Sequence, residues 1–345
     1  MSIFINGRFL LQPQTGVNRF AFELTRAMVN AGEDITVICP RGNISDDYDV
    51  SSFKIQRFGL GRSHFWEQIV LPLFFLFHKG ILLSFTGLGP VVLRRKIITI
   101  HDLAFYENPL WYSKLYVLFY KLMTPLCAKT SRFILTVSEF SKKEIYLKLG
   151  IPLAKIHVLY NAVSSGFLKP VQKKVSENYI LAVSTLDPRK NFRRLVESFV
   201  GWENNSNIKL YLVGGKNSVF ANWEIIENEN IKWLGRVSDE ELVSLYQNAL
   251  CFVYPSLYEG FGIPPLEAMA SGVPVIVSDI PPLREVCDKA AIYVDPYDID
   301  DMKLAFSSVV SDITLRQSLV ENGKERFVQF SWDKSAEKLA EILKL

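Results

Sequence analysis

Two glutamates with seven residues between them flank a glycine-rich stretch, Glu259-Gly-Phe-Gly-Ile-Pro-Pro-Leu-Glu267. The stretch follows an apolar run that ends at Tyr254, and it leads into a helical pattern. Glycine lets backbone N–H groups approach a ligand closely, and the first turn of a helix adds partial positive charge. The sequence therefore predicts an anion site to which Gly260, Phe261 and Gly262 contribute backbone amides and both carboxylates face one ligand.

Two adjacent cations, Arg189 and Lys190, follow another strand-like run, Tyr179 to Val183, and stand just before a helical pattern. Fixed cations of this kind neutralise a diphosphate leaving group. We therefore expect Arg189 and Lys190 to act on such a group. The alternative is a solvated surface pair.

The first half of the chain carries two further candidates. Gly16 follows the first apolar run and starts a helical pattern, and His101 with Asp102 follows the run Ile97 to Ile100. Ligand sites of α/β domains lie at the carboxyl ends of their strands, so both positions suit a site. Thr15 also suits a plain helix N-cap, and a lone histidine is often structural.

These residues need elements to position them, and the apolar runs indicate which. Short Val-, Ile- and Leu-rich runs alternate with helical patterns through the first half, and the alternation restarts after a polar stretch at residues 169–178. The pattern predicts an α/β fold of two Rossmann-like, doubly wound domains facing a central cleft. We place the first domain at residues 1–165 and the second at 166–330.

The segment from Glu259 to Glu267 resembles the E-x7-E motif of retaining glycosyltransferase family 4 (glycosyl transferases group 1), whose members have the GT-B fold. The resemblance implies that Glu267 binds the donor ribose, whereas Glu259 and His101 contact the transferred sugar. After Trp233-Leu-Gly, it places Arg236 and Val237 in the nucleobase pocket.

The resemblance also implies roles for whole segments. It makes residues 1–165 the acceptor-binding domain and residues 166–330 the nucleotide-sugar domain, with Gly16 near the donor phosphate. A helix in residues 331–345 is expected to pack back on the first domain. Many members carry a Gly-Arg pair where this chain has Ser184-Thr185, which leaves the role of Arg189 open.

The sequence that the E-x7-E motif has in this chain is similar to that of bacterial mannosyl- and rhamnosyltransferases that build surface polysaccharides such as O-antigen. It implies a retaining, metal-independent hexosyltransferase that uses GDP-mannose and a lipid-linked oligosaccharide acceptor, and no cofactor apart from the donor substrate. TDP-rhamnose or a UDP-sugar is the alternative donor. The resemblance favours front-face departure, in which the leaving phosphate takes the acceptor proton.

Charge and apolar segments bear on the partners of the chain. Residues 1–165 carry a net charge of +8 and the remainder −5, so the first half suits an anionic surface. The apolar run at residues 69–77 is shorter than the roughly 20 residues that span a bilayer. With the aromatic and basic segment 110–128, it indicates either membrane-surface contact or core packing.

Other classes fit less well. No G-x-G-x-x-G follows a predicted strand, which argues against a nicotinamide dehydrogenase. A non-enzymatic anion- or nucleic-acid-binding protein is the alternative from another class, but no nucleic-acid motif appears and we expect no nucleic acid partner. Scattered cysteines and an N-terminus unlike a signal peptide predict a cytoplasmic location, peripheral on the inner face of the plasma membrane.

Overall fold

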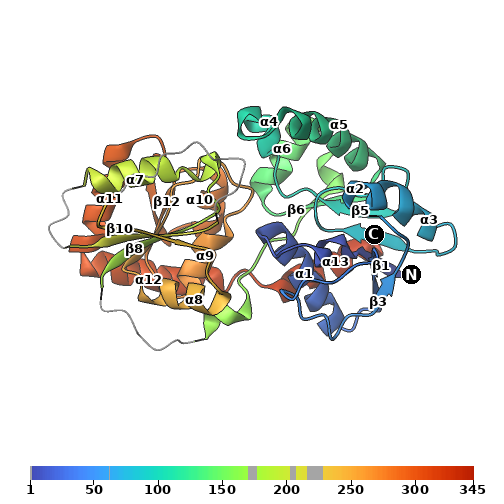
Figure 1. Ribbon diagram of the computed structural model, residues 1–345, viewed down its shortest axis with the longest axis horizontal. Coiled ribbons are helices and arrows are strands. Elements are labelled where there is room, and N and C mark those ends of the chain that lie inside the picture. The colour runs from blue at the N-terminus through green and yellow to red at the C-terminus, as the bar shows by residue number, and fades with distance from the viewer. Residues whose placement is uncertain (1, 62, 170–176, 203–206, 216–227) are drawn as a thin grey trace. The chain divides into compact units, whose positions relative to one another are not determined.

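The computed structural model describes residues 2–61, 63–169, 177–202, 207–215 and 228–345. The chain divides into two compact units (Figure 1). Unit 1 comprises Met1–Asn161 together with Ser331–Leu345, and unit 2 comprises Ala162–Phe330. The boundary therefore falls after Asn161, slightly before the position expected from the sequence, and the last segment belongs to unit 1.

Unit 1 is built on a seven-stranded parallel sheet in the order β3-β2-β1-β4-β5-β6-β7. β2 and β3 follow one another on one side of β1, whereas β4 to β7 follow one another on its other side. The strand order therefore reverses between β1 and β4. Ligands of open α/β sheets bind at such a reversal. The strands are β1 (Ile3–Asn6), β2 (Ile35–Cys39), β3 (Ile55–Arg57), β4 (Ile81–Ser84), β5 (Lys96–Thr99), β6 (Phe133–Thr136) and β7 (Ile156–Val158).

Helices cover both faces of this sheet (Figure 1). α1 begins at Gly16 because the side chain of Thr15 accepts a hydrogen bond from the N–H of Asn18, which confirms the predicted N-cap. α1 packs against α13, where the rings of Phe20 and Trp332 lie 5.7 Å apart. The longer elements are α1 (Gly16–Asn30), α5 (Lys114–Thr130), α6 (Glu139–Leu149) and α13 (Trp332–Lys344). The shorter ones are η1 (Gly7–Leu11), α2 (Ser63–Phe65), the π-helical η2 (Trp66–Val70), α3 (Leu71–Phe74), α4 (Ala104–Glu107), η3 (Pro109–Trp111) and η4 (Leu153–Lys155).

Unit 2 is built on a six-stranded parallel sheet in the order β10-β9-β8-β11-β12-β13, which reverses between β8 and β11. α7 and α11 lie on one face, while α8, α9 and α12 lie on the other (Figure 1). The strands are β8 (Tyr179–Val183), β9 (Lys209–Val213), β10 (Ile231–Gly235), β11 (Cys251–Tyr254), β12 (Val275–Ser278) and β13 (Ala291–Val294). The helices are η5 (Ser165–Leu168), η6 (Pro188–Lys190), α7 (Phe192–Val200), α8 (Asp239–Asn248), α9 (Ile263–Ala270), α10 (Pro281–Cys287), α11 (Ile299–Ser311) and α12 (Ile313–Phe327).

The doubly wound organisation predicted from the apolar runs is confirmed in both units. Three strands, β3, β7 and β10, lack a continuous apolar run, and each is an edge strand of its sheet. An edge strand has one open side and carries polar residues, such as Gln56 in β3 and Lys232 in β10. The continuous apolar run that marks a central parallel strand is therefore absent from these segments.

Candidate functional site

At the reversal point of the second sheet, a lysine and a glutamate meet. Lys190 comes from the loop after β8 and Glu259 from the loop after β11, and Lys190 Nζ lies 2.6 Å from Glu259 Oε1. Lys190 Nζ also donates to the hydroxyl of Tyr254, the last residue of β11, at 2.8 Å. The two charged side chains are only 13% and 11% exposed. The fold thus fixes one cation and one carboxylate where ligands of such sheets bind.

The surroundings of Lys190 keep it charged. Burial by itself lowers the pKa of Lys190, but the carboxylate of Glu259 and the phenol oxygen of Tyr254 outweigh it, so that the net pKa is raised. Burial also raises the pKa of Tyr254, so its hydroxyl stays neutral. At neutral pH the site therefore holds a permanent ammonium group between an oxygen acceptor and a carboxylate.

Arg189 is held by its neighbour Asp187. Its Nε and Nη2 donate to Asp187 Oδ2 at 2.9 and 2.7 Å, and its backbone N–H donates to Asp187 Oδ1 at 2.9 Å. The backbone N–H of Leu257 donates to the carbonyl of Arg189 at 2.7 Å, which ties the β8 loop to the β11 loop. Each of the two predicted cations thus faces a carboxylate, a pairing that the sequence analysis did not foresee.

The glycine loop ends where α9 begins. Gly262 has φ +104°, and a Cβ added there would lie 2.5 Å from Leu283 Cδ2, so a larger residue does not fit without rearrangement. Phe261 is buried with its ring 5.6 Å from that of Phe330, which anchors the loop, and Gly260 is buried beside it. The helix following directly on Gly262 carries Glu267.

Glu267 lies in α9 and is 6% exposed. Its Oε2 accepts a hydrogen bond from the hydroxyl of Tyr246, in α8, at 3.1 Å. The hydrogen bond fixes the orientation of this buried carboxylate. A residue that binds two neighbouring hydroxyl groups requires such a fixed orientation. The sequence analysis did not identify Tyr246, because the two residues are brought together by the packing of α8 on α9.

Arg236 and Val237 lie in the connection from β10 to α8, at the carboxyl end of the same sheet. Arg236 is exposed and Val237 is half-buried. Ser238 next to them caps α8, with its hydroxyl accepting from the N–H of Glu241 and the Glu241 carboxylate accepting from the N–H of Ser238. These two hydrogen bonds form a capping box and give Ser238 a structural role. Lys190 follows β8, and β9 lies between β8 and β10. Arg236 and Val237 therefore lie two strands away from Lys190 along the carboxyl edge of the sheet.

In unit 1, His101 follows β5 at its carboxyl end. Its Nε2 lies 2.8 Å from the carbonyl oxygen of Phe85, which only accepts, so Nε2 carries the proton. Burial lowers the pKa of His101, offset in part by the Phe85 hydrogen bond and by Asp102. The ring is therefore neutral at pH 7 and has its lone pair on Nδ1. Asp102 accepts from the N–H of Ala104 at 3.0 Å.

Gly16 is the first residue of α1. An added Cβ at Gly16 would meet nothing within 4 Å, so the backbone there is open. The structure brings Arg189, Lys190, Glu259 and the glycine loop together in unit 2, whereas Gly16 and His101 stand at strand ends of unit 1.

The Asp-x-Asp triplets that would suggest a metal serve local hydrogen bonds. Asp298 caps α11 by accepting from the N–H groups of Asp300 and Asp301, and Asp47 accepts from Ser45 and from the N–H of Gln14. Among the described residues, no group of three or more His, Cys, Asp or Glu side chains is arranged to hold a metal ion. Metal independence stays a prediction.

Comparisons with known proteins agree with this arrangement. Residues 167–326 match the family model described as "Glycosyl transferases group 1", and residues 14–166 match that described as "Glycosyltransferase Family 4". The chain is 32% identical over 263 residues to O-antigen chain mannosyltransferase B of Escherichia coli, covering 71% of this chain and 68% of that one. It is 34% identical over 224 residues to O-antigen chain mannosyltransferase RfbU of Salmonella typhimurium, covering 63% of this chain and 62% of that one.

Among solved structures, the chain resembles Anabaena Alr3699/HepE in complex with UDP-glucose. The TM-score is 0.77 with 99% of this chain and 98% of that chain covered, at 15% sequence identity. At this identity the likeness concerns the fold alone.

Proposed function

Because this chain belongs to the group 1, family 4 glycosyltransferases and has their GT-B fold, we propose that it transfers mannose from GDP-mannose to a lipid-linked glycan, with retention of configuration and without a metal ion. The observation that carries the proposal is the Lys190–Glu259 pair at the reversal point of the second sheet. The donor follows the names of the two O-antigen mannosyltransferases, and TDP-rhamnose or a UDP-sugar is the alternative.

Departure of a nucleoside diphosphate builds negative charge on the leaving phosphate. Lys190 offers a permanent cation there, Arg189 stands next to it, and the N-terminus of α9 adds partial positive charge. Such fixed positive groups take the place of a divalent metal. The buried carboxylate of Glu267 suits the hydroxyl groups of the donor ribose.

The pairing of Glu259 bears on the mechanism. A nucleophilic carboxylate needs a free oxygen aimed at the anomeric carbon, but Glu259 Oε1 is held 2.6 Å from Lys190 Nζ. This favours front-face departure, in which the leaving phosphate accepts the proton of the attacking hydroxyl and the acceptor oxygen forms its bond on the side that the phosphate leaves. Glu259 then orients the sugar.

A transfer assay tests this function. The purified protein receives GDP-mannose, TDP-rhamnose or UDP-glucose in EDTA, with a mannobiose linked to a phenoxyundecyl diphosphate as acceptor. We expect a product from GDP-mannose alone, and NMR should show an α-linked sugar from the α-linked donor. Glu267→Ala should raise the donor KM, because the ribose hydroxyls lose their carboxylate partner. An inverted product, or activity that EDTA removes, would contradict the mechanism.

A surface of unit 1 supports action at a membrane. α5 presents a row of exposed leucines at helical spacing, on the side opposite its buried Cys127 and Ala128. A second exposed apolar row runs along α2, η2 and α3 and into the turn that follows α3. The first row consists of Leu115, Leu118, Leu122 and Leu126, and the second of Phe65, Ile69, Leu73, Leu76 and Phe77.

The two rows are neighbours, because His64 of α2 lies against α5 with its ring 4.9 Å from that of Phe119. Unit 1 adds charge to this apolar face: α5 carries three lysines, Lys114, Lys121 and Lys129, and no acidic residue. Apolar area together with lysines is what binds a helix to an anionic lipid surface. Within the described residues, no helix has the length and apolar character that crossing a bilayer requires.

Vesicle flotation tests this part of the proposal. We expect the protein to float with vesicles that contain phosphatidylglycerol and to stay behind with pure phosphatidylcholine. The double change Leu118→Glu with Leu122→Glu should abolish flotation. The matched control is Leu304→Glu with Ile313→Glu, which alters two similarly exposed apolar residues of unit 2. Equal flotation of both double variants would refute the assignment.

A further inference from the structure

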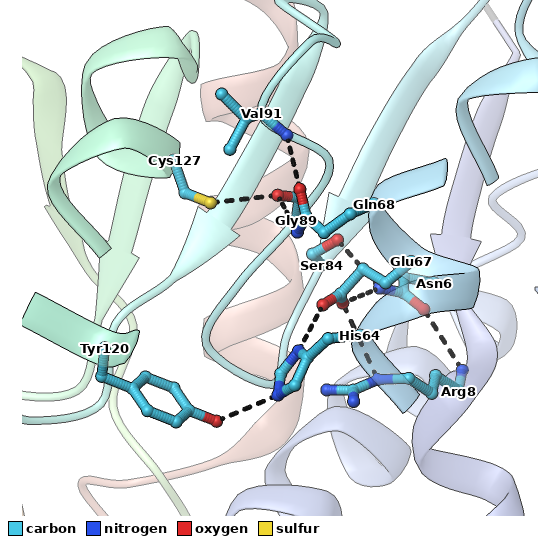
Figure 2. Close-up of polar contacts among 10 residues, drawn as sticks. All are labelled: Asn6, Arg8, His64, Glu67, Gln68, Ser84, Gly89, Val91, Tyr120 and Cys127. Atoms are coloured by element: carbon cyan, nitrogen blue, oxygen red, sulfur yellow. Dashed lines mark hydrogen bonds and ion pairs between the residues drawn. The ribbon is translucent and has the colours of Figure 1, made fainter. Parts of the chain in front are cut away.

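The reversal point of the first sheet also holds buried charge (Figure 2). The side chain of Glu67 is completely buried. Its Oε1 accepts from Asn6 Nδ2 at 2.6 Å and lies 3.8 Å from Arg8 Nε, while its Oε2 lies 3.3 Å from His64 Nδ1. Burying a carboxylate is unfavourable unless hydrogen bonds and opposite charge surround it, and here Asn6 and His64 supply hydrogen-bond contacts and Arg8 supplies the charge.

The position of this cluster points to a ligand. Asn6 is the last residue of β1 and Ser84 the last of β4, the two strands between which the order reverses, and Asn6 Nδ2 also lies 3.3 Å from Ser84 Oγ. Glu67 itself belongs to the π-helical η2, and such segments are frequent at functional sites. Ser84 directly precedes Phe85, whose carbonyl holds His101. The cluster is therefore built into the same strand ends as the candidate site of unit 1.

His64 is the part of the cluster that a ligand can reach, since its side chain is 29% exposed. Glu67 faces Nδ1, so Nδ1 carries the proton and Nε2 presents a lone pair 3.4 Å from the hydroxyl of Tyr120. Burial raises the pKa of Tyr120, which keeps that hydroxyl neutral. The ring of Phe119 lies 4.9 Å from that of His64. A molecule that binds here therefore contacts hydrogen-bonding groups next to aromatic rings.

The charges decide which kind of molecule fits. Arg8 and Glu67 are of opposite sign and 3.8 Å apart, so the cluster has little net charge to attract a phosphate. Polar groups beside aromatic rings suit a neutral molecule with several hydroxyl groups and apolar C–H faces. A sugar has this chemistry.

We propose that His64 and Tyr120 bind hydroxyl groups of the acceptor glycan, and that Glu67 is a positioning residue that fixes the ring of His64. This assignment rests on the proposed function, because it supplies the acceptor side of the same reaction. Asn6 and Arg8 hold Glu67 in place from β1 and η1. The site therefore sets affinity for the acceptor and leaves donor binding unchanged.

Steady-state kinetics with GDP-mannose and the phenoxyundecyl diphosphate-linked mannobiose test it. His64→Phe keeps an aromatic ring without hydrogen bonds, and Tyr120→Phe removes only a hydroxyl. Each should raise the acceptor KM about tenfold, the equivalent of one hydrogen bond, with the donor KM and kcat within about twofold. His78→Phe is the matched control, because His78 is an exposed histidine stacked on Phe74.

Nitrogen-15 NMR of the histidine rings tests the positioning role. In the wild type, His64 should be protonated at Nδ1, and in Glu67→Gln the ring should lose this preference while the acceptor KM rises as in His64→Phe. An acceptor KM unchanged in both Tyr120→Phe and His64→Phe, or an equal rise in the donor KM, would overturn the assignment. A wild type without transfer from any donor would instead refute the proposed function, and this assignment would fall with it.

Discussion

Replacing Lys190 by methionine should destabilise unit 2 strongly. The change keeps most of the side-chain volume but leaves the carboxylate of Glu259 and the hydroxyl of Tyr254 without their shared donor. Breaking a buried ion pair lowers the free energy of unfolding by about 3–5 kcal/mol. The side chains of Lys190 and Glu259 keep 13% and 11% exposure, so we expect the lower end, about 3 kcal/mol. For a unit of this size that lowers Tm by about 6–12 °C.

Differential scanning calorimetry measures this effect, and a double-mutant cycle isolates the pair. Glu259→Gln alone leaves the ammonium of Lys190 poorly compensated, whereas the double variant removes both charges and should lose less than the sum of the single changes. Arg193→Met is the control, since Arg193 is 74% exposed and its pair with Glu197 is expected to contribute about 0.3–0.5 kcal/mol. If Lys190→Met shifts Tm no more than Arg193→Met, or if the losses are additive, the pair does not stabilise the site.

Three further outcomes are expected. Lys190→Met should lower kcat about a hundredfold in the transfer assay, because the leaving phosphate loses a fixed cation. Gly262→Ala should lower the free energy of unfolding by about 1–3 kcal/mol through positive φ and the clash with Leu283, whereas Gly16→Ala should not, and urea unfolding compares them. Because the pKa of His101 is lowered, unfolded chains bind more protons. Stability should fall as pH drops below about 6.5, with a flatter profile in His101→Gln.

The sequence predicted the central strands of each sheet and the strand, loop and helix that carry Glu259 and Glu267. Strands such as β11, Cys251–Tyr254, are fully buried, so their composition alone marks them and the loop that follows. A local signal also sufficed for the cap at Thr15, because a cap depends on residues within one turn.

Specific side-chain contacts were beyond the sequence pattern, both within one loop and between distant segments. Asp187 stands two residues before Arg189, yet only the folded loop shows that it holds the guanidinium. Glu67 and Gln68 are two adjacent polar residues just before the apolar run at residues 69–77, and the partner of Glu67, Asn6, is 61 positions away. Such clusters depend on which strands become neighbours.

The apolar run at residues 69–77 shows a third case, because one side of it packs in the core and the other side is exposed. Leu71 and Phe74 are buried in the core, while Leu73 and Phe77 are exposed. A helix turns successive residues through about 100°, so a segment apolar on all sides serves two surfaces. Composition cannot say which side faces inward, and packing against β1 and β4 decides it through residues such as Phe4 and Leu82.

The return of α13 to unit 1 has a consequence for synthesis on the ribosome. Unit 2 is one continuous stretch of chain, whereas unit 1 is interrupted and receives α13 only after all of unit 2 has been made. Until then, the surface of α1 around Phe20 lacks its cover from Trp332, and the backbone carbonyl of Tyr160 lacks the hydroxyl of Ser335. The nascent first unit therefore exposes an apolar flank until α13 has been made, and exposed apolar surface of this kind is what chaperones bind.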